Sequence, residues 1–452
     1  MSPVEDTLRS TQDAYPADLA RFVRERWDED RAGTLPDQGT LETLISTCYQ
    51  ASLLREEERA VTFRVILCDP DLLPAREGPP GGSHSLEFPS PRQLDVQEIR
   101  RLSPAADYYR SLIGIIFDEE EGLRIWGLVH TGPRWLREGQ GGRDVPPPLP
   151  TALVLRAHGP GRIAVDIGLE AVCKLEEGRL SDTSMNVFDS RWLPDTFAPV
   201  RGEIAEIHAG LRDQARKKGE VWARLDNDII RVIGQHTIKR IISAVRDSHH
   251  GGTLVIVPPS LAGDILEDRY VSLKYKFVDA EPRRRFRTLI VDVMNALARS
   301  YAGTPARDPV GWDDYEASSD RELTGLDEAI FEVAHLIAGL TAVDGAVVMT
   351  QRFEMLGFGG EISGGLPVVE TVARALDVEA DAAVEESVGG VGTRHRSAYR
   401  LCNELRDVIA VVISQDGNVR FIKRKDGAVT CDEDVTPGPR TRSRCSPSRR
   451  CK

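Results

Sequence analysis

The side chains best suited to phosphate chemistry lie in two short stretches of the C-terminal half. The first is Asp344-Gly345-Ala346, a carboxylate beside a glycine. The second runs from Gly392 to Arg396 and reads Gly-Thr-Arg-His-Arg. Carboxylate oxygens are preferred ligands of Mg²⁺ and Mn²⁺, and guanidinium groups match phosphate oxygens with paired hydrogen bonds. The two stretches are therefore candidates for a metal site and a polyphosphate site.

The Gly392–Arg396 stretch precedes a helical pattern that runs to about Leu405. Gly392 permits close backbone approach, and Thr393 can cap the helix. The N–H groups at a helix start attract anions, and His395 adds a donor that can be charged near neutral pH. The bland alternative is a solvated basic face. Asp-Gly likewise is common in ordinary turns, so neither stretch decides a function by itself.

Alternating helices and apolar strands surround both stretches. Helical spacing covers Ile229–Val245, Arg287–Ala298 and Leu326–Leu340, and short apolar runs cover Thr253–Val257, Ala346–Met349, Phe353–Gly357, Val408–Ser414 and Val419–Lys423. This alternation predicts an α/β fold, with a mixed β-sheet flanked by helices. The Asp-Gly pair lies where a long helix passes into a strand, which positions its carboxylate at one end of the sheet.

The pair of motifs resembles the two signature motifs of the bacterial diadenylate cyclase (DAC) domain family. Asp-Gly-Ala is followed downstream by Gly-Thr-Arg-His-Arg-Ser-Ala, and the resemblance covers about residues 225–430. It implies a DAC-type sheet and an enzyme that condenses two ATP molecules into cyclic di-AMP and two pyrophosphates, with Mg²⁺ or Mn²⁺. It also implies self-association, with two cyclase domains face to face and one ATP bound to each.

The resemblance also assigns roles to residues. Asp344 would lie near the metal and the attacking 3′-hydroxyl, and Arg394, His395 and Arg396 would contact the phosphates. The remaining positions implied in ATP binding are Gly345, Ala346, Gly392, Thr393 and Ser414. Phe358 is a candidate to stack on a base, with a core position as the alternative.

Some positions depart from the family pattern. The motifs are 50 residues apart, from Asp344 to Arg394, and the excess lies in residues 363–388, expected to form a lid or a surface insertion. Val343 stands where some relatives have histidine, and Gln415 and Asp416 follow the serine. Two alternatives therefore stay open: a catalytically degenerate nucleotide-binding sensor module, and a nucleotidyltransferase that makes a different dinucleotide.

The N-terminal half shows no catalytic constellation. Helical spacing covers about residues 15–60, a loop is expected over 69–95, and strand patterns follow to Ile167. We expect an α+β regulatory or sensor-like domain over 1–205 and a linker helix over 206–224. The cyclase domain is expected over 225–435, and a disordered basic tail over 436–452.

Composition limits the partners and the compartment. The net charge of −13 does not favour nucleic acid, apart from weak contact by the basic tail. No apolar run reaches the length that spans a bilayer, and the N-terminus lacks signal-peptide features. Seven scattered cysteines without a CxxC pattern indicate reduced thiols. We therefore expect a cytoplasmic protein without membrane contact.

Overall fold

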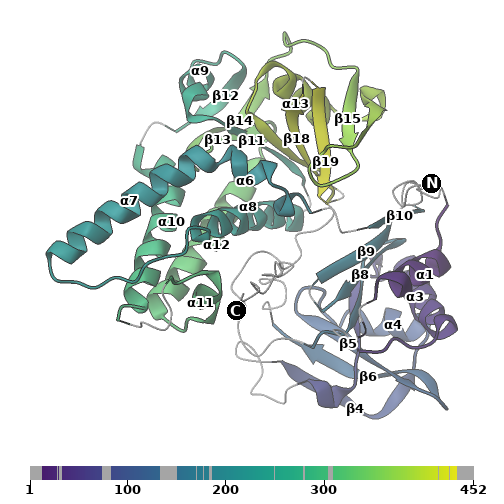
Figure 1. Ribbon diagram of the computed structural model, residues 1–452. Coiled ribbons are helices and arrows are strands. Elements are labelled where there is room, and N and C mark those ends of the chain that lie inside the picture. The colour runs from purple at the N-terminus through teal and green to yellow at the C-terminus, as the bar shows by residue number, and fades with distance from the viewer. Residues whose placement is uncertain are drawn as a thin grey trace, which may run out of the picture. The chain divides into compact units, whose positions relative to one another are not determined.

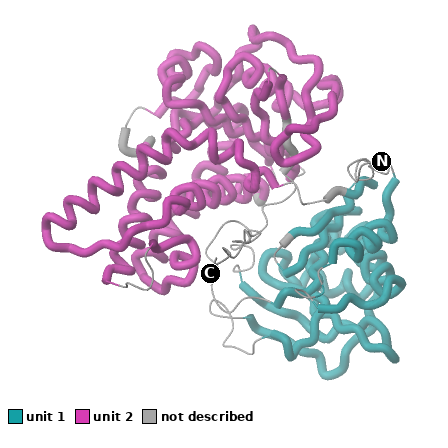
Figure 2. The backbone as a smooth tube through the Cα atoms, viewed as in Figure 1, with its two compact units in different colours: residues 1–139, 144–184, 438–452 teal, residues 140–143, 185–437 magenta. Residues whose placement is uncertain are grey.

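The chain forms two compact units in the computed structural model, coloured separately in Figure 2. The structure describes residues 13–27, 29, 33–73, 83–132, 150–168, 170–176, 178–182, 186–248, 250–277, 280–303, 309–415, 417–426 and 428–434. Of these, unit 1 takes residues 13–182 and unit 2 takes residues 186–434. The predicted tail over 436–452 and Asp416 lie outside the described residues.

Unit 1 is built on an eight-stranded sheet with the order β10-β9-β8-β7-β3-β5-β6-β4. Neighbouring strands are antiparallel except β3 and β5, which are parallel. The strands are β3 Phe63–Leu67, β4 His84–Gln93, β5 Ser111–Asp118, β6 Gly122–His130, β7 Leu153–Gly159, β8 Arg162–Ile167, β9 Glu170–Glu176 and β10 Arg179–Asp182. A separate two-stranded ribbon pairs β1 Arg55–Glu56 with β2 Arg59–Ala60.

The helices α1 Pro16–Arg26, α3 Gln38–Ser52 and α4 Val96–Leu102 pack on one face of this sheet (Figure 1). Asp37 begins α3 by accepting hydrogen bonds from the N–H groups of Gly39 and Thr40. The apolar side of α3, including Leu41, Leu44 and Ile45, is fully buried. Unit 1 is thus an α+β fold, as the sequence predicts.

Unit 2 contains a nine-stranded mixed sheet with the order β12-β14-β13-β11-β17-β18-β19-β15-β16. β11 pairs parallel with β13 and antiparallel with β17. The strands are β11 Gly252–Val257, β12 Val271–Lys276, β13 Ala346–Thr350, β14 Met355–Ile362, β15 Thr371–Ala375, β16 Ala383–Ser387, β17 Ile409–Ile413, β18 Val419–Lys425 and β19 Ala428–Asp434. The central strands β11, β13 and β17 are buried along their whole length, as strands covered on both faces are.

Helices cover both faces of the unit 2 sheet (Figure 1). The longer ones, α7 Ala198–Lys217, α8 Ile229–Asp247, α10 Ala280–Ser300 and α12 Arg321–Thr341, form the core with one face. On the other face lie α9 Ala262–Leu266 and α13 Thr393–Glu404. The unit also contains the helices α6 Trp192–Thr196 and α11 Trp312–Ala317 and the 3₁₀ turns η2 Val187–Asp189, η3 Pro259–Leu261 and η5 Val388–Gly390. The mixed α/β sheet predicted from the sequence is confirmed.

Two expectations about boundaries differ from the structure. The predicted loop over 69–95 is wrong in part, because β4 occupies His84–Gln93 at the edge of the sheet. Pro89 and Pro91 argue against a strand at the level of sequence. An edge strand nevertheless tolerates proline, because the N–H groups on its outer side form no hydrogen bonds with another strand. Of the expected linker helix over 206–224, only residues 206–217 are helical, as the end of α7, whose Val200 and Ile204 belong to the core of unit 2. The division between units therefore falls near residue 185 and not near 205.

The described part of the chain also bears on cysteines and membranes. Cys48, Cys68, Cys173 and Cys402 are free and buried. Burial raises the pKa of the Cys68 thiol to about 12, so it stays protonated at neutral pH. In the same described ranges no helix is long and apolar enough to span a membrane.

Candidate functional site

One end of the unit 2 sheet collects the residues predicted to act together. Thr253 of β11 is level with Ala346 of β13, and Gly252 is level with Ile413 of β17. Asp344 and Gly345 precede β13, and Ser414 follows β17, so both lie at the end of the sheet where β11 begins. Because neighbouring strands lie about 4.8 Å apart, β13 and β17 are separated by about 10 Å across β11.

Asp344 is an exposed carboxylate between α12 and β13. In the described part of the chain, its side chain has no hydrogen-bond or ion-pair partner. Gly345, which follows it, has φ of +116°, and a Cβ at this position would lie 2.6 Å from the carbonyl carbon of Gly359. Only glycine fits so close to β14. The carboxylate of Asp344 is thus presented to solvent by a tightly constrained turn.

The helix α13 brings the arginine-rich motif to the same end of the sheet. Gly392 is the N-cap of α13 and Thr393 its first helical residue, so the expectation that Thr393 caps the helix is wrong. A guanidinium nitrogen of Arg394, Nη1, donates to the carbonyl of His250 at 3.2 Å. A Cβ on Gly251 would lie 2.9 Å from this Nη1 and 3.0 Å from the amide nitrogen of Gln415. Arg394 therefore reaches the turns that flank β11 and β17.

The other two residues of the Arg-His-Arg motif differ in exposure. Arg396 is exposed, and its backbone N–H donates to the carbonyl of Gly392 at 3.2 Å. His395 is half-buried, and its ring centroid lies 6.3 Å from that of Tyr399. The unpaired N–H groups of the first helical turn add partial positive charge at the same place. This end of α13 is suited to an anion.

Ser414 closes a turn after β17. Its backbone N–H donates to the carbonyl of Asn418 at 2.8 Å, and its Oγ accepts from the N–H of Asn418 at 3.1 Å. The hydroxyl hydrogen can still donate to a further acceptor. Arg394 and the backbone on either side of Ser414 therefore lie against the Gly251 turn, and Asp344 precedes the neighbouring strand β13 at the same sheet end.

Two glycine pairs were not predicted from the sequence as parts of this site. Gly251 has φ of +63°, and a Cβ there would lie 2.7 Å from the carbonyl oxygen of Ile413. Gly359 has φ of +62°, and Gly360 lies level with Ala346. Gly251-Gly252 lies at the start of β11 and Gly359-Gly360 lies inside β14, and the pairing of glycines was the available signal. They mark places where backbone approaches backbone too closely for a side chain.

Phe358 belongs to a small aromatic cluster. Its ring stacks on Tyr275 with centroids 4.6 Å apart, and Phe277 lies 5.8 Å away. Phe358 is partly buried, whereas Tyr275 is 54% exposed. The alternative that Phe358 packs in the fold therefore accounts for its contacts, and Tyr275 is the exposed ring of the pair.

The excess stretch over 363–388 is a sheet extension. It forms the antiparallel hairpin of β15 and β16, and β15 pairs parallel with β19. Asp377 organises the turn between the strands by accepting hydrogen bonds from the N–H groups of Glu379 and Asp381 at 2.9 and 3.1 Å. Burial opposes ionisation of Asp377, but these backbone bonds hold its pKa below the usual range. The hairpin is an ordered edge of the sheet.

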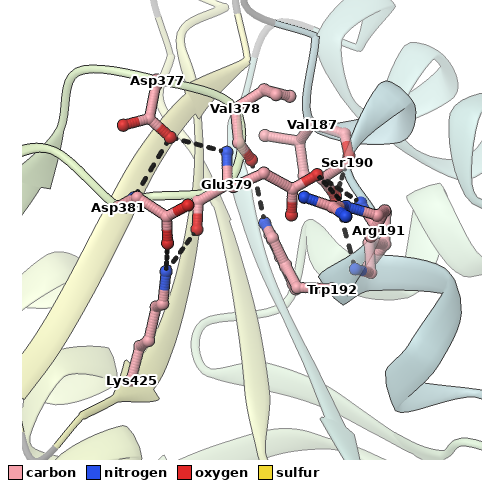
Figure 3. Close-up of polar contacts among 10 residues, drawn as sticks. Val187, Ser190, Arg191, Trp192, Asp377, Val378, Glu379, Asp381 and Lys425 are labelled. Carbon is pink, nitrogen blue, oxygen red and sulfur yellow. Dashed lines mark hydrogen bonds and ion pairs between the residues drawn. The ribbon is translucent and has the colours of Figure 1, made fainter.

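The hairpin tip binds the segment that begins unit 2 (Figure 3). The carboxylate of Glu379 accepts from the backbone N–H of Arg191 at 2.9 Å, and the carbonyl of Val378 accepts from the indole of Trp192 at 3.3 Å. Lys425 of β18 donates to the carbonyl of Glu379 at 2.6 Å and to Asp381 at 2.7 Å. The hydrogen bond to Asp381 raises the pKa of Lys425. Glu379 therefore holds Arg191, whereas Asp377 and Asp381 stabilise the hairpin tip.

Comparisons with known proteins concern unit 1. Residues 30–130 match a family model described as "Probable sensor domain DACNV", a domain associated with the N-termini of diadenylate cyclases. The match covers less than half of the chain and lies wholly within unit 1. No curated protein and no solved structure matches the chain.

Proposed function

We propose that unit 2 is a diadenylate cyclase, which condenses two ATP molecules into cyclic di-AMP and two pyrophosphates. The observation that carries the proposal is the convergence of the two motifs at one end of the sheet. Arg394 and the backbone that flanks Ser414 lie against the Gly251 turn, and Asp344 precedes the neighbouring strand β13. The sensor-domain match in unit 1 supports the same assignment, since that domain is associated with these enzymes.

The triphosphate of ATP would bind at the start of α13. Arg396 is exposed and has no side-chain partner in the described ranges, so its guanidinium is available to phosphate oxygens. Arg394 and His395 add donors beside it, and Gly392 and Thr393 expose backbone N–H groups. The hydroxyl of Ser414 supplies a further donor. At the start of β13, on the other side of β11, the backbone of Gly345 and Ala346 would contact the nucleotide.

Asp344 is the residue we propose for the divalent cation. Mg²⁺ at nucleotide sites is commonly held by one or two carboxylates together with substrate phosphates and water, so one exposed carboxylate fits a site that ATP completes. When bound, Mg²⁺ or Mn²⁺ would neutralise phosphate charge and favour deprotonation of the 3′-hydroxyl. Asp344 itself would orient that hydroxyl toward the neighbouring nucleotide.

The reaction requires two nucleotides in fixed positions. The 3′-oxygen of each ATP attacks the α-phosphorus of the other, the bond to pyrophosphate breaks, and the hydroxyl proton is released. Asp-Gly-Ala recurs at residues 426–428, but Gly-Thr-Arg-His-Arg occurs once, so the chain supplies one phosphate-binding site. We therefore propose that two chains bring their sites face to face, in the twofold arrangement commonest among oligomers. Because ATP is the substrate, the cytoplasm is the compartment we propose.

Unit 1 is proposed to regulate the cyclase through the hairpin. The hairpin tip holds Arg191 and Trp192, which lie near the start of unit 2. At the hairpin's other strand, Glu386 lies 3.8 Å from Arg420, whose Nη1 donates to the hydroxyl of Tyr399 on α13 at 3.1 Å. A change in the segment after unit 1 therefore has a continuous path of contacts to the phosphate-binding helix.

A second candidate is a nucleotide-binding module without turnover. In the described ranges, no group of three or more His, Cys, Asp or Glu side chains could hold a metal ion by itself. A nucleotidyltransferase that makes a different dinucleotide shares the same phosphate chemistry and differs only in the base.

The direct test is to incubate the purified chain with ATP and Mg²⁺ or Mn²⁺ and to identify the product by mass. Cyclic di-AMP is the expected product. ATP that binds but stays unchanged with both metals would favour the nucleotide-binding module. A mixed product formed with another nucleotide would favour the nucleotidyltransferase that makes a different dinucleotide.

A further inference from the structure

A small cavity lies between α8 and the two helices that begin unit 2. Its walls come from α6, α7 and α8, from Ile290 of α10 and from Phe353 in the turn between β13 and β14. Asp344 precedes the five-residue strand β13 and Phe353 follows it, and a strand of that length spans about 17 Å. The cavity is therefore separate from the candidate nucleotide site.

The lining of the cavity is mostly apolar. Five of the lining side chains are at most 8% exposed: Leu193, Val200, Ile204, Ile230 and Ile238. The ring of Phe353 forms a further wall, stacked on Phe197 with centroids 5.8 Å apart and edge to face with Phe286 at 5.5 Å. A water molecule needs two to four polar partners, which such walls do not offer. The interior of the cavity is therefore suited to an apolar group.

Gly234, in the middle of α8, leaves part of this space open. A Cβ at Gly234 would meet ring atoms of Phe353 at 3.8 and 3.9 Å, which are ordinary contact distances. A side chain would therefore fit here, in contrast to Gly345, where backbone of β14 lies too close. Glycine inside a helix lowers stability relative to alanine. Packing does not require this glycine, and its effect is to keep the space beside Phe353 free.

Arg201 of α7 places a cation at the edge of the cavity. Its Nη1 donates to the carbonyl of Pro194, and in the described part of the chain no carboxylate lies within ion-pair distance of its guanidinium. Burial lowers the pKa of Arg201 and the charge of Arg231 lowers it further, whereas Asp195 and Asp228 oppose this from farther away. Arg231 itself is paired with Asp228 at 3.0 Å. A guanidinium has five N–H donors, so Arg201 retains donors for an acid group.

We propose that this cavity binds a short-chain carboxylic acid, with its carboxylate on Arg201 and its apolar chain between Gly234 and Phe353. The planar guanidinium matches a carboxylate with paired hydrogen bonds. The cavity volume is about 30 Å³, and one water needs about 10–15 Å³, so the interior has room for two or three heavy atoms in line. A chain of about three carbons beyond the carboxylate fits that size. The site does not depend on the proposed cyclase activity, because it lies at the other end of β13.

The test is a titration of the full chain, with ¹³C-labelled isoleucine methyl groups, followed by nuclear magnetic resonance. The probes are sodium butanoate, sodium acetate and 1-butanol, with sodium chloride added to constant ionic strength. The methyl signals of Ile230 and Ile238 report on the cavity, and each is assigned by its loss on replacement with valine. The methyl signal of Ile66, buried in unit 1, is the internal reference.

Two substitutions separate the apolar part of the site from the charge. Gly234→Leu fills the space beside Phe353, and Gly234→Ala fills it in part. Gly210→Leu is the matched control, because Gly210 lies on α7 and a Cβ there would meet no atom within 4 Å. Arg201→Gln removes the charge, and Arg216→Gln, at an exposed position on the same helix, is its control.

Butanoate is expected to shift the Ile230 and Ile238 signals saturably and to bind more tightly than acetate or 1-butanol. Gly234→Leu should weaken butanoate binding at least about tenfold, since the chain loses its apolar surroundings. Arg201→Gln should weaken it at least about tenfold, for the lost charge-assisted hydrogen bonds, and should leave 1-butanol unaffected. Both control variants should bind butanoate like the parent.

Circular dichroism establishes that each variant is folded, and Gly234→Ala replaces Gly234→Leu if the leucine variant is not. Butanoate binding as tight as the parent's in the folded Gly234 variant or in Arg201→Gln overturns the site. Binding of 1-butanol as tight as that of butanoate overturns the acid as its ligand. Absence of a saturable shift with butanoate overturns the proposal as a whole.

Discussion

Asp344 combines exposure with a fixed backbone, because Gly345 after it fits only as glycine against β14. We predict that Asp344→Asn lowers cyclase turnover at least about a hundredfold, the scale of removing one electrostatic group from a preorganised site. The melting temperature should not change, since the carboxylate has no partner in the described ranges. Turnover is measured by pyrophosphate release. Asp313→Asn, at an exposed position on α11, is the matched control and should retain parent activity.

Turnover of Asp344→Asn within a few fold of the parent would contradict the assigned role. A large drop in Asp313→Asn would show instead that the assay responds to surface charge in general.

Arg394 and Arg396 of α13 are both expected to contribute to ATP binding, but only Arg394 is expected to contribute to the stability of the fold. Arg394 donates to the carbonyl of His250, whereas Arg396 is exposed. Both Arg394→Ala and Arg396→Ala should weaken ATP binding. Only Arg394→Ala should lower the free energy of unfolding, by about 0.5–1.5 kcal/mol for the lost hydrogen bond. Lysine at either position should restore binding only in part, because an ammonium group lacks the fork.

Titration calorimetry with ATP and thermal unfolding measure these two effects. ATP binding as tight as the parent's in both alanine variants would mean that the phosphates bind elsewhere.

At the scale of elements, the β15–β16 hairpin is predicted to hold residues 187–192. Glu379→Ala removes the acceptor for the backbone N–H of Arg191. Hydrogen exchange at Arg191 should then become about tenfold faster, the effect of losing one charge-assisted bond. Glu385→Ala, at an exposed position on β16, is the control and should leave exchange at Arg191 unchanged. Equal protection of Arg191 in both variants would show that the hairpin tip does not hold the segment.

The sequence predicted most elements of unit 2 because its strands are short apolar runs between helices with regular spacing. It placed Asp344 before a strand and the arginines at a helix start, as observed. The excess stretch was not predicted as strands, because Val384, Glu385 and Glu386 form an edge strand with mostly exposed side chains and no apolar periodicity. The Gly251 turn was not predicted as part of the site, since its role depends on Arg394, distant in the sequence.

At the scale of the whole molecule, activity is predicted to require two chains. One site can order one ATP, and the large advantage of preset geometry needs the second nucleotide to be ordered as well. Specific activity should therefore rise with protein concentration over the range in which dimers form. Mixing Asp344→Asn chains into the parent should lower activity more than dilution with buffer does, because mixed pairs lack one working site. Constant specific activity from a protein shown to be monomeric would exclude this arrangement.

The central claim is that this chain joins two ATP molecules to each other, and isotope labelling tests it most directly. The parent chain is incubated with Mg²⁺ or Mn²⁺ and an equal mixture of unlabelled and fully ¹⁵N-labelled ATP, and the product is examined by mass spectrometry. The account predicts cyclic di-AMP in unlabelled, half-labelled and fully labelled forms, with the half-labelled form the most abundant and two pyrophosphates released per product. ATP recovered unchanged from folded, dimeric protein that binds it, or a product containing a single nucleotide, would contradict the account.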